Sequence, residues 1–134
     1  HVAILPPGPV TGNSLGVGYF RYGPKKRLRT LLGVMNSLVF EVQVRALLAT
    51  AHVSQGVLRR CSVAESFFSD ERTEASVLRA VERREESDQA QPHLEVQIAK
   101  GYGLTRDEFA ATLEAFPKLT PAERDSLTDP TLWR

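Results

Sequence analysis

The chain has 134 residues, of which 42% are hydrophobic and 25% charged, and its formal net charge is +1. This length allows one domain or two small subdomains, with a hydrophobic core that needs no disulfide or metal to hold it together. Cys61 is the single cysteine, which excludes a disulfide framework and a cysteine-based metal site and leads us to expect a reducing, cytoplasmic location.

The small net charge hides a difference between the two halves. Residues 1–66 carry eight Lys or Arg against two Glu, whereas residues 67–134 carry nine basic against fourteen acidic residues. A polyanionic partner for the first half would explain this split. The alternative, which stays open, is that the two halves attract each other. We expect one unit at 1–66 and an acidic helical subdomain at 67–134.

The hydropathy pattern predicts no membrane partner. No segment approaches 18 uninterrupted apolar residues, so nothing is expected to span a bilayer. The sequence starts at His1 rather than at a methionine, and no signal-peptide pattern follows. We expect the chain to be a piece of a longer protein.

The first predicted elements are short strands. Residues 2–5, "VAIL", form an apolar run that "PPGP" ends, which indicates a brief strand entering a turn. After the "TGNS" turn, residues 15–21, "LGVGYFR", predict a second strand.

A helical pattern starts near Lys26 and reaches about Thr50. Its apolar residues recur at the spacing of one buried stripe. The pattern allows one long helix or two that join near residues 33–37, where Asn36 and Ser37 could cap the second. The stripe consists of Leu28, Leu31, Leu32, Met35, Leu38, Val39, Val42 and Ala46.

A polar run follows that helix. Residues 50–56, "TAHVSQG", have no period and predict a loop, and residues 57–63, "VLRRCSV", predict a strand that returns to a sheet. The expected fold class is therefore α+β: a small mixed α/β unit with short strands and a long apolar helix, followed by helices.

The second half is predicted to be helical. Residues 70–86 form a mostly solvated acidic helix, and a helix over about 94–102 ends at Gly103. Thr105 with Glu108 has the spacing of a capping box, with Leu104 and Phe109 as a hydrophobic staple. Phe109, Leu113 and Phe116 would line the buried face. The cap recurs at Thr120, Pro121 and Glu123.

Catalytic chemistry is missing from the sequence. The three histidines are scattered without metal-ligand spacing, and Cys61 has no context that marks a nucleophile. The carboxylates Glu82, Glu85 and Glu86 stand among arginines, where a structural role is the better interpretation. We expect no catalytic residue, no metal and no cofactor in this chain.

The basic residues favour nucleic acid instead. Cations that neutralise phosphates give salt-dependent affinity, and the intervening polar run "HVSQG" supplies groups that can read base edges, as Gln55 could with adenine. A solvated face, or local backbone contacts of His52 and Gln55, remains the alternative. The candidate DNA-binding residues are Arg21, Lys25, Lys26, Arg27, Arg29, His52, Ser54, Gln55, Arg59 and Arg60.

A segment spanning residues 31–63 carries a resemblance to a known family. It resembles the carboxy-terminal target-recognition region of N6-adenine DNA methyltransferases, especially bacterial restriction–modification enzymes of type II that fuse methylation and cleavage. That region has Leu-Leu-x-x-Leu-Asn-Ser, an aromatic and an Arg before a glycine-containing polar run and a basic strand. The matching residues are Leu31, Leu32, Met35, Asn36, Ser37, Phe40, Arg45, Gly56, Arg59 and Arg60.

Loose similarity to that region extends over most of residues 2–119. The resemblance implies a parent that methylates adenine with S-adenosylmethionine. The parent's Asn/Asp-Pro-Pro-Tyr/Phe motif is absent, because "LPPG" at 5–8 lacks its first and last residues. The chain would thus be the recognition part alone, with double-stranded DNA and a methyltransferase domain or subunit as partners. The alternative is a protein–protein interaction or subunit-assembly module without a nucleic-acid role.

Overall fold

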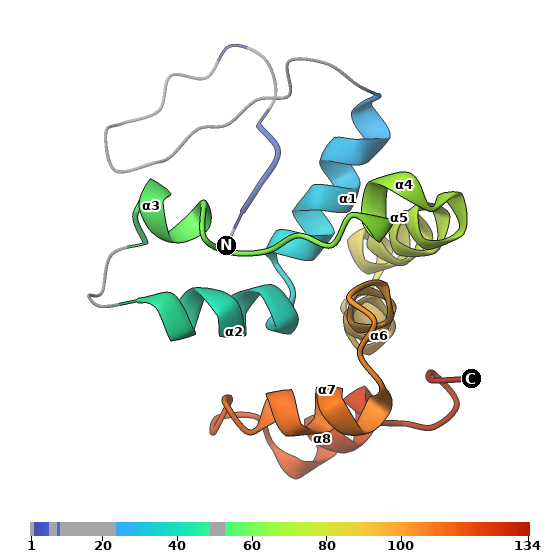
Figure 1. The fold of residues 1–134 in the computed structure, drawn as a ribbon. Helices are drawn as coiled ribbons and strands as arrows, with labels where there is room; N and C mark the ends of the chain where they lie inside the picture. Colours follow the sequence, from blue (N-terminus) through green and yellow to red (C-terminus); the bar gives the residue numbers. More distant parts are fainter. Residues whose placement is uncertain (1, 6–7, 9–23, 49–52) are drawn as a thin grey trace.

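The computed structural model describes residues 2–5, 8, 24–48 and 53–134, and these residues form helices joined by short connections (Figure 1). In chain order, the elements are α1 (Lys25–Met35), α2 (Leu38–Leu47), α3 (Gln55–Leu58), α4 (Ser66–Ser69), α5 (Glu71–Glu86), the 3₁₀ turn η1 (Asp88–Ala90), α6 (Gln91–Gly101), α7 (Arg106–Leu113) and α8 (Pro121–Leu127).

The α+β prediction is wrong, because the described ranges contain no strand. Residues 2–5 are exposed, and the main chain of Val2 pairs with the side chain of Asn36 instead of a strand. The strand predicted over 57–63 is also wrong, because Ser54 caps a helical turn there and α3 runs to Leu58. The strand predicted at 15–21 lies outside the described residues.

The long apolar helix is two helices that meet at a corner. α1 ends at Met35, α2 begins at Leu38, and the two axes are bent by 63°. The Oγ of Ser37 accepts a hydrogen bond from the N–H of Phe40, as an N-cap does. Of the two arrangements that the sequence allows, the structure has two helices, and Ser37 caps the second.

Length and apolar composition decide whether a described helix could cross a bilayer. No single helix there is long and apolar enough to cross a bilayer, although the bent pair α1 and α2 passes on length and composition when taken together. Val34 of α1 and Phe40 of α2 are both buried in the protein core.

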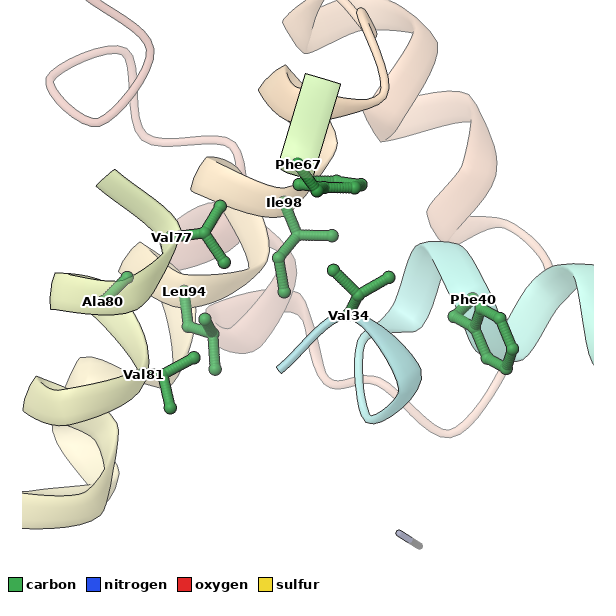
Figure 2. Packing of buried hydrophobic residues seen from close by; sticks show 8 residues of the cluster. All are labelled: Val34, Phe40, Phe67, Val77, Ala80, Val81, Leu94 and Ile98. Carbon is green, nitrogen blue, oxygen red and sulfur yellow. The ribbon is translucent and has the colours of Figure 1, made fainter. Parts of the chain in front are cut away.

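One hydrophobic cluster joins α1 and α2 to α4, α5 and α6 (Figure 2). Phe67 of α4 is fully buried there, and its ring meets Tyr102 edge-on at a centroid distance of 5.1 Å. Residues on both sides of the expected boundary at 66/67 contribute to this cluster. Its buried members are Val34, Phe40, Phe67, Val77, Ala80, Val81, Leu94 and Ile98.

A second cluster holds α7 and α8 against α2 and α6, and Figure 1 shows this pair below α2. Both predicted capping boxes are confirmed at Thr105 and Thr120. The connection before α7 turns at Gly103, whose φ of +80° suits glycine, as expected. The buried members are Val39, Ala99, Phe109, Leu113 and Leu127. Phe116 is buried too, as predicted.

Candidate nucleic-acid interface

Three of the predicted DNA-binding cations on α1 form ion pairs with α5. Lys26 Nζ lies 2.9 Å from Glu74 Oε2, and Arg27 donates a hydrogen bond to the carbonyl of Phe68 at 3.2 Å. The guanidinium of Arg29 lies 3.6 Å from Glu82 and 3.3 Å from Glu85. The first turns of α1 are therefore tied to the acidic helix.

Glu74 is the centre of this contact. Its side chain is 8% exposed, whereas that of Lys26 is 51% exposed. Its Oε1 faces Arg27 Nε at 3.8 Å, which is beyond hydrogen-bond distance. A carboxylate buried to this degree needs a nearby cation, so Lys26 and Arg27 support the α1–α5 packing.

The other predicted site residues fall into three groups. Lys25, at the start of α1, is exposed and has no ion pair within the described ranges. Arg21 and His52 lie outside the described residues. The remaining four candidates are Ser54, Gln55, Arg59 and Arg60, which the fold brings together on one short segment.

This α3 segment, residues 54–60, presents polar side chains to solvent. The Oγ of Ser54 accepts a hydrogen bond from the N–H of Val57 at 3.3 Å and so starts the helical turn. Gln55 is exposed at the first position of α3, and Arg59 and Arg60 are exposed just after its last residue. Gln55 and Arg59 are four positions apart and so lie on one side of the helical turn, and Arg60 follows next in the chain.

Arg59 and Arg60 have no carboxylate partner in the described part of the chain. The ranges that the structure does not describe contain no Asp or Glu, as the sequence shows. These two arginines therefore differ from Lys26, Arg27 and Arg29 in carrying charge that no ion pair offsets.

A residue that the sequence analysis did not single out ties the chain just after the α3 segment to α2. Gln43 of α2 accepts a hydrogen bond from the N–H of Ser62 at 2.8 Å and donates one to its carbonyl at 3.2 Å. The hydroxyl of Tyr102 donates to the same carbonyl at 2.8 Å, and burial raises the pKa of Tyr102 to about 12. No sequence pattern signals this bidentate contact, because it joins residues 19 positions apart.

The described residues show little chemistry of other kinds. No group of three or more His, Cys, Asp or Glu among them is arranged to hold a metal ion. Burial raises the pKa of the Cys61 thiol, which disfavours the nucleophilic thiolate. Glu82 and Glu85 pair with Arg29, a structural role.

Comparisons with known proteins return no match from family models, from curated proteins or from solved structures.

Proposed function

We propose that this chain is the sequence-specific DNA-recognition fragment of an S-adenosylmethionine-dependent adenine DNA methyltransferase or restriction enzyme. In this role it positions the duplex for a catalytic domain that the chain does not contain, and it transfers no methyl group itself. The cofactor belongs to that catalytic domain. A cytoplasmic, bacterial setting follows from the same proposal.

The α1–α2 corner, which carries the Asn36–Ser37 pair of the resemblance, serves as a scaffold. Ser37 is buried and caps α2, and Asn36 pairs with both main-chain polar groups of Val2 at 2.8 Å. Met35 and Phe40 contact the first hydrophobic cluster. Asn36 and Ser37 therefore order the main chain at the corner. In this proposal the contacts with DNA are made by the α3 segment that follows.

The observation that carries the proposal is the pair Arg59 and Arg60. Both are exposed, neither has a carboxylate partner among the described residues, and both follow the exposed Gln55 on a segment anchored by Gln43. Arginines can hold phosphates or guanine, and a glutamine amide can pair with adenine. Anchoring this segment lowers the cost of ordering it on binding.

Most cations of α1 do not belong to the proposed DNA-binding face, although the sequence suggested that they would. Lys26, Arg27 and Arg29 are committed to α5, so only Lys25 on that helix extends the binding face. Charge reversal at Lys26 or Arg27 would also disturb the packing around Glu74. A test of DNA binding at those positions would mix folding with affinity.

The test uses Arg59→Ala/Arg60→Ala in fluorescence anisotropy with mixed-sequence duplex DNA. We expect wild-type binding at about 50 mM salt. In the variant, the negative slope of log affinity against log salt should become less steep by about 2. The matched control is Arg84→Ala/Arg106→Ala, which removes the same charge from residues paired with Asp88 and Asp107. No duplex binding by the wild type, or equal losses in both variants, would refute the proposal.

Sequence reading is tested separately with Gln55→Ala. Selection from a random duplex library should give the wild-type chain a preferred site, and Gln55→Ala should relax one position of it at a cost of about 1–3 kcal/mol. An unchanged preference would remove Gln55 from the reading face.

A subunit-assembly role is the second candidate, and two exposed apolar residues favour it. Val53 is 52% exposed and Leu58 is 36% exposed, and both belong to the same short stretch as the arginines. Light scattering on wild type and on Val53→Ser/Leu58→Ser separates the two functions. Self-association that disappears in this variant, without any duplex binding, would favour assembly.

A further inference from the structure

α5 carries three arginines on a different face from the carboxylates that pair with α1, and Glu86 lies at the end of the arginine face. Glu74, Glu82 and Glu85 meet the cations of α1, as described above. Arg72, Arg79 and Arg83 are spaced by seven and four residues, so they follow one another along a different stripe of the helix. All three are exposed.

This basic stripe borders a hollow between α5 and α6. The hollow has a volume of about 670 Å³, and its walls combine the cations Arg72, Arg79 and Lys100 with the small residues Ala75, Ser76 and Gly101. Gln97 also lines it, and the Ser76 hydroxyl donates a hydrogen bond to Gln97 Oε1 at 2.6 Å. A second hollow of about 470 Å³, bordered by Arg83 and His93, adjoins the same two helices.

The arginines of this α5–α6 face form no ion pair with a described residue, although the carboxylate of Asp70 interacts with the charge of Arg72. Arg72, Arg79 and Arg83 have no ion pair within the described ranges, which contain every Asp and Glu of the chain. Glu71 and Glu86 lie at its two ends.

Two further groups on α6 add to this surface. Lys100 donates hydrogen bonds to the main-chain oxygens of Leu132 and Arg134 at 2.8 and 3.1 Å, and its side chain lines the hollow. The pKa of His93 is lowered, first by burial and then by Arg83 and Lys100. The positive charges of Arg83 on α5 and Lys100 on α6 therefore both act on His93.

We propose that the α5–α6 face, formed by Arg72, Arg79, Arg83 and Lys100, is a binding surface for the phosphate backbone of double-stranded DNA. The fold pairs Glu74, Glu82 and Glu85 with the cations of α1 and leaves Arg72, Arg79 and Arg83 without an ion pair among the described residues. The acidic half of the sequence thus carries a nucleic-acid contact of its own. This surface is separate from the α3 segment and needs no base reading.

The dimensions of the stripe suit a DNA backbone. Arg72 and Arg83 are 11 positions apart, which on an α-helix is about 16 Å. One DNA strand presents a charge about every 3.4 Å along its axis, so several phosphates fall within this length. Guanidinium groups bind phosphate oxygens bidentately, and the small residues between the arginines permit close approach. An acidic polypeptide is the competing partner, and the test below discriminates against it.

The test measures duplex affinity against salt for Arg72→Ala/Arg79→Ala, again with Arg84→Ala/Arg106→Ala as the charge-matched control. Because both substituted arginines are exposed, the circular dichroism spectrum should not change. We expect the negative slope of log affinity against log salt to become less steep by about 2, and the affinity at about 50 mM salt to fall at least tenfold. Arg79→Gln/Arg83→Gln is the second variant and should behave in the same way.

The outcomes separate this surface from the α3 segment. Loss in Arg72→Ala/Arg79→Ala with full binding in Arg59→Ala/Arg60→Ala supports the α5–α6 face and refutes the α3 segment; the reverse result refutes the α5–α6 face. Losses in both, without loss in the control, support both. Polyglutamate that displaces the duplex as effectively as unlabelled DNA, at equal charge concentration, would overturn the DNA assignment.

Discussion

The carboxylate of Glu95, in the middle of α6, accepts a hydrogen bond from the main-chain N–H of Leu38 at 2.9 Å, at the first residue of α2. Its other oxygen accepts from the side-chain amide of Gln91 at 2.7 Å. The N-terminus of a helix favours negative charge, so Glu95 complements α2 from a different helix. This contact joins the corner that precedes the α3 segment to the centre of the core.

Glu95→Gln should change how stability depends on pH. Burial raises the pKa of Glu95 to about 7, while its hydrogen bonds to Leu38 and Gln91 lower it and Glu41 adds to the rise. The folded state thus prefers the protonated form. The stability that this preference adds is fully present below about pH 4.5, the ordinary pKa of a glutamate, and is lost as the pH rises through 7.

Chemical unfolding between pH 4 and 8 provides the measurement, with about 3 kcal/mol as the upper bound on the change. The free energy of unfolding of the wild type should fall, relative to Glu95→Gln, across the window from about 4.5 to 7. His93 has a lowered pKa and opposes this trend in both proteins, so it cancels in the difference. Parallel pH curves for the two proteins would show that Glu95 does not titrate in this window.

The Lys26–Glu74 pair should couple more strongly than an exposed pair. A double-mutant cycle with Lys26→Ala and Glu74→Ala should give a coupling of about 1 kcal/mol, because the Glu74 side chain is only 8% exposed. The control is the exposed pair Glu41 and Arg45 on α2, for which we expect less than about 0.5 kcal/mol. Equal couplings would mean that burial of Glu74 adds nothing to the contact.

Gly101→Ala should destabilise the core. A Cβ at this position would lie 2.1 Å from Cε1 of Phe67, whose fully buried ring also packs against Tyr102. Overpacking of this kind costs roughly 1–3 kcal/mol. Thermal unfolding of Gly56→Ala is the control, because its Cβ would meet only Ser54 Oγ at 3.5 Å. A Gly101→Ala protein as stable as Gly56→Ala would contradict the close approach of α4 to α6.

Local signals allowed most helices to be predicted from the sequence. Thr105 and Thr120 have the short-range spacing of capping boxes, and the apolar stripe of α1 and α2 has a clear period. The strands predicted at 2–5 and 57–63 were wrong because both runs are short, and in such short runs periodicity does not separate a strand from a turn or a short helix. Ser54, read only as a polar group for DNA, was the cap that decided the second case.

The candidate site was harder to predict, because a charge count does not reveal which charges pair. Lys26, Arg27 and Arg29 are close together in sequence, but their partners lie more than 40 positions away on α5. The alternative, that the two halves attract each other, is right for Lys26, Arg27 and Arg29, because all three pair with carboxylates of the second half. It does not describe Arg59 and Arg60, which have no carboxylate partner among the residues whose placement is given.

Gln43→Ala should loosen the α3 segment without removing any charge. The substitution deletes both hydrogen bonds to Ser62 and leaves the bond from Tyr102. Hydrogen exchange at Arg59, Arg60 and Ser62 should become faster, while exchange in the buried part of α6 should not change. Gln89→Ala, at an exposed position in η1, is the matched control.

The same variant connects the scaffold to the proposed function. Because Gln43→Ala leaves every cation in place, duplex affinity should fall several-fold through the added cost of ordering the segment, and the salt slope should stay at the wild-type value. Arg59→Ala/Arg60→Ala should instead lower the slope. A reduced slope in Gln43→Ala would mean that the substitution changes which cations reach the DNA, and Gln43 would then be more than an anchor.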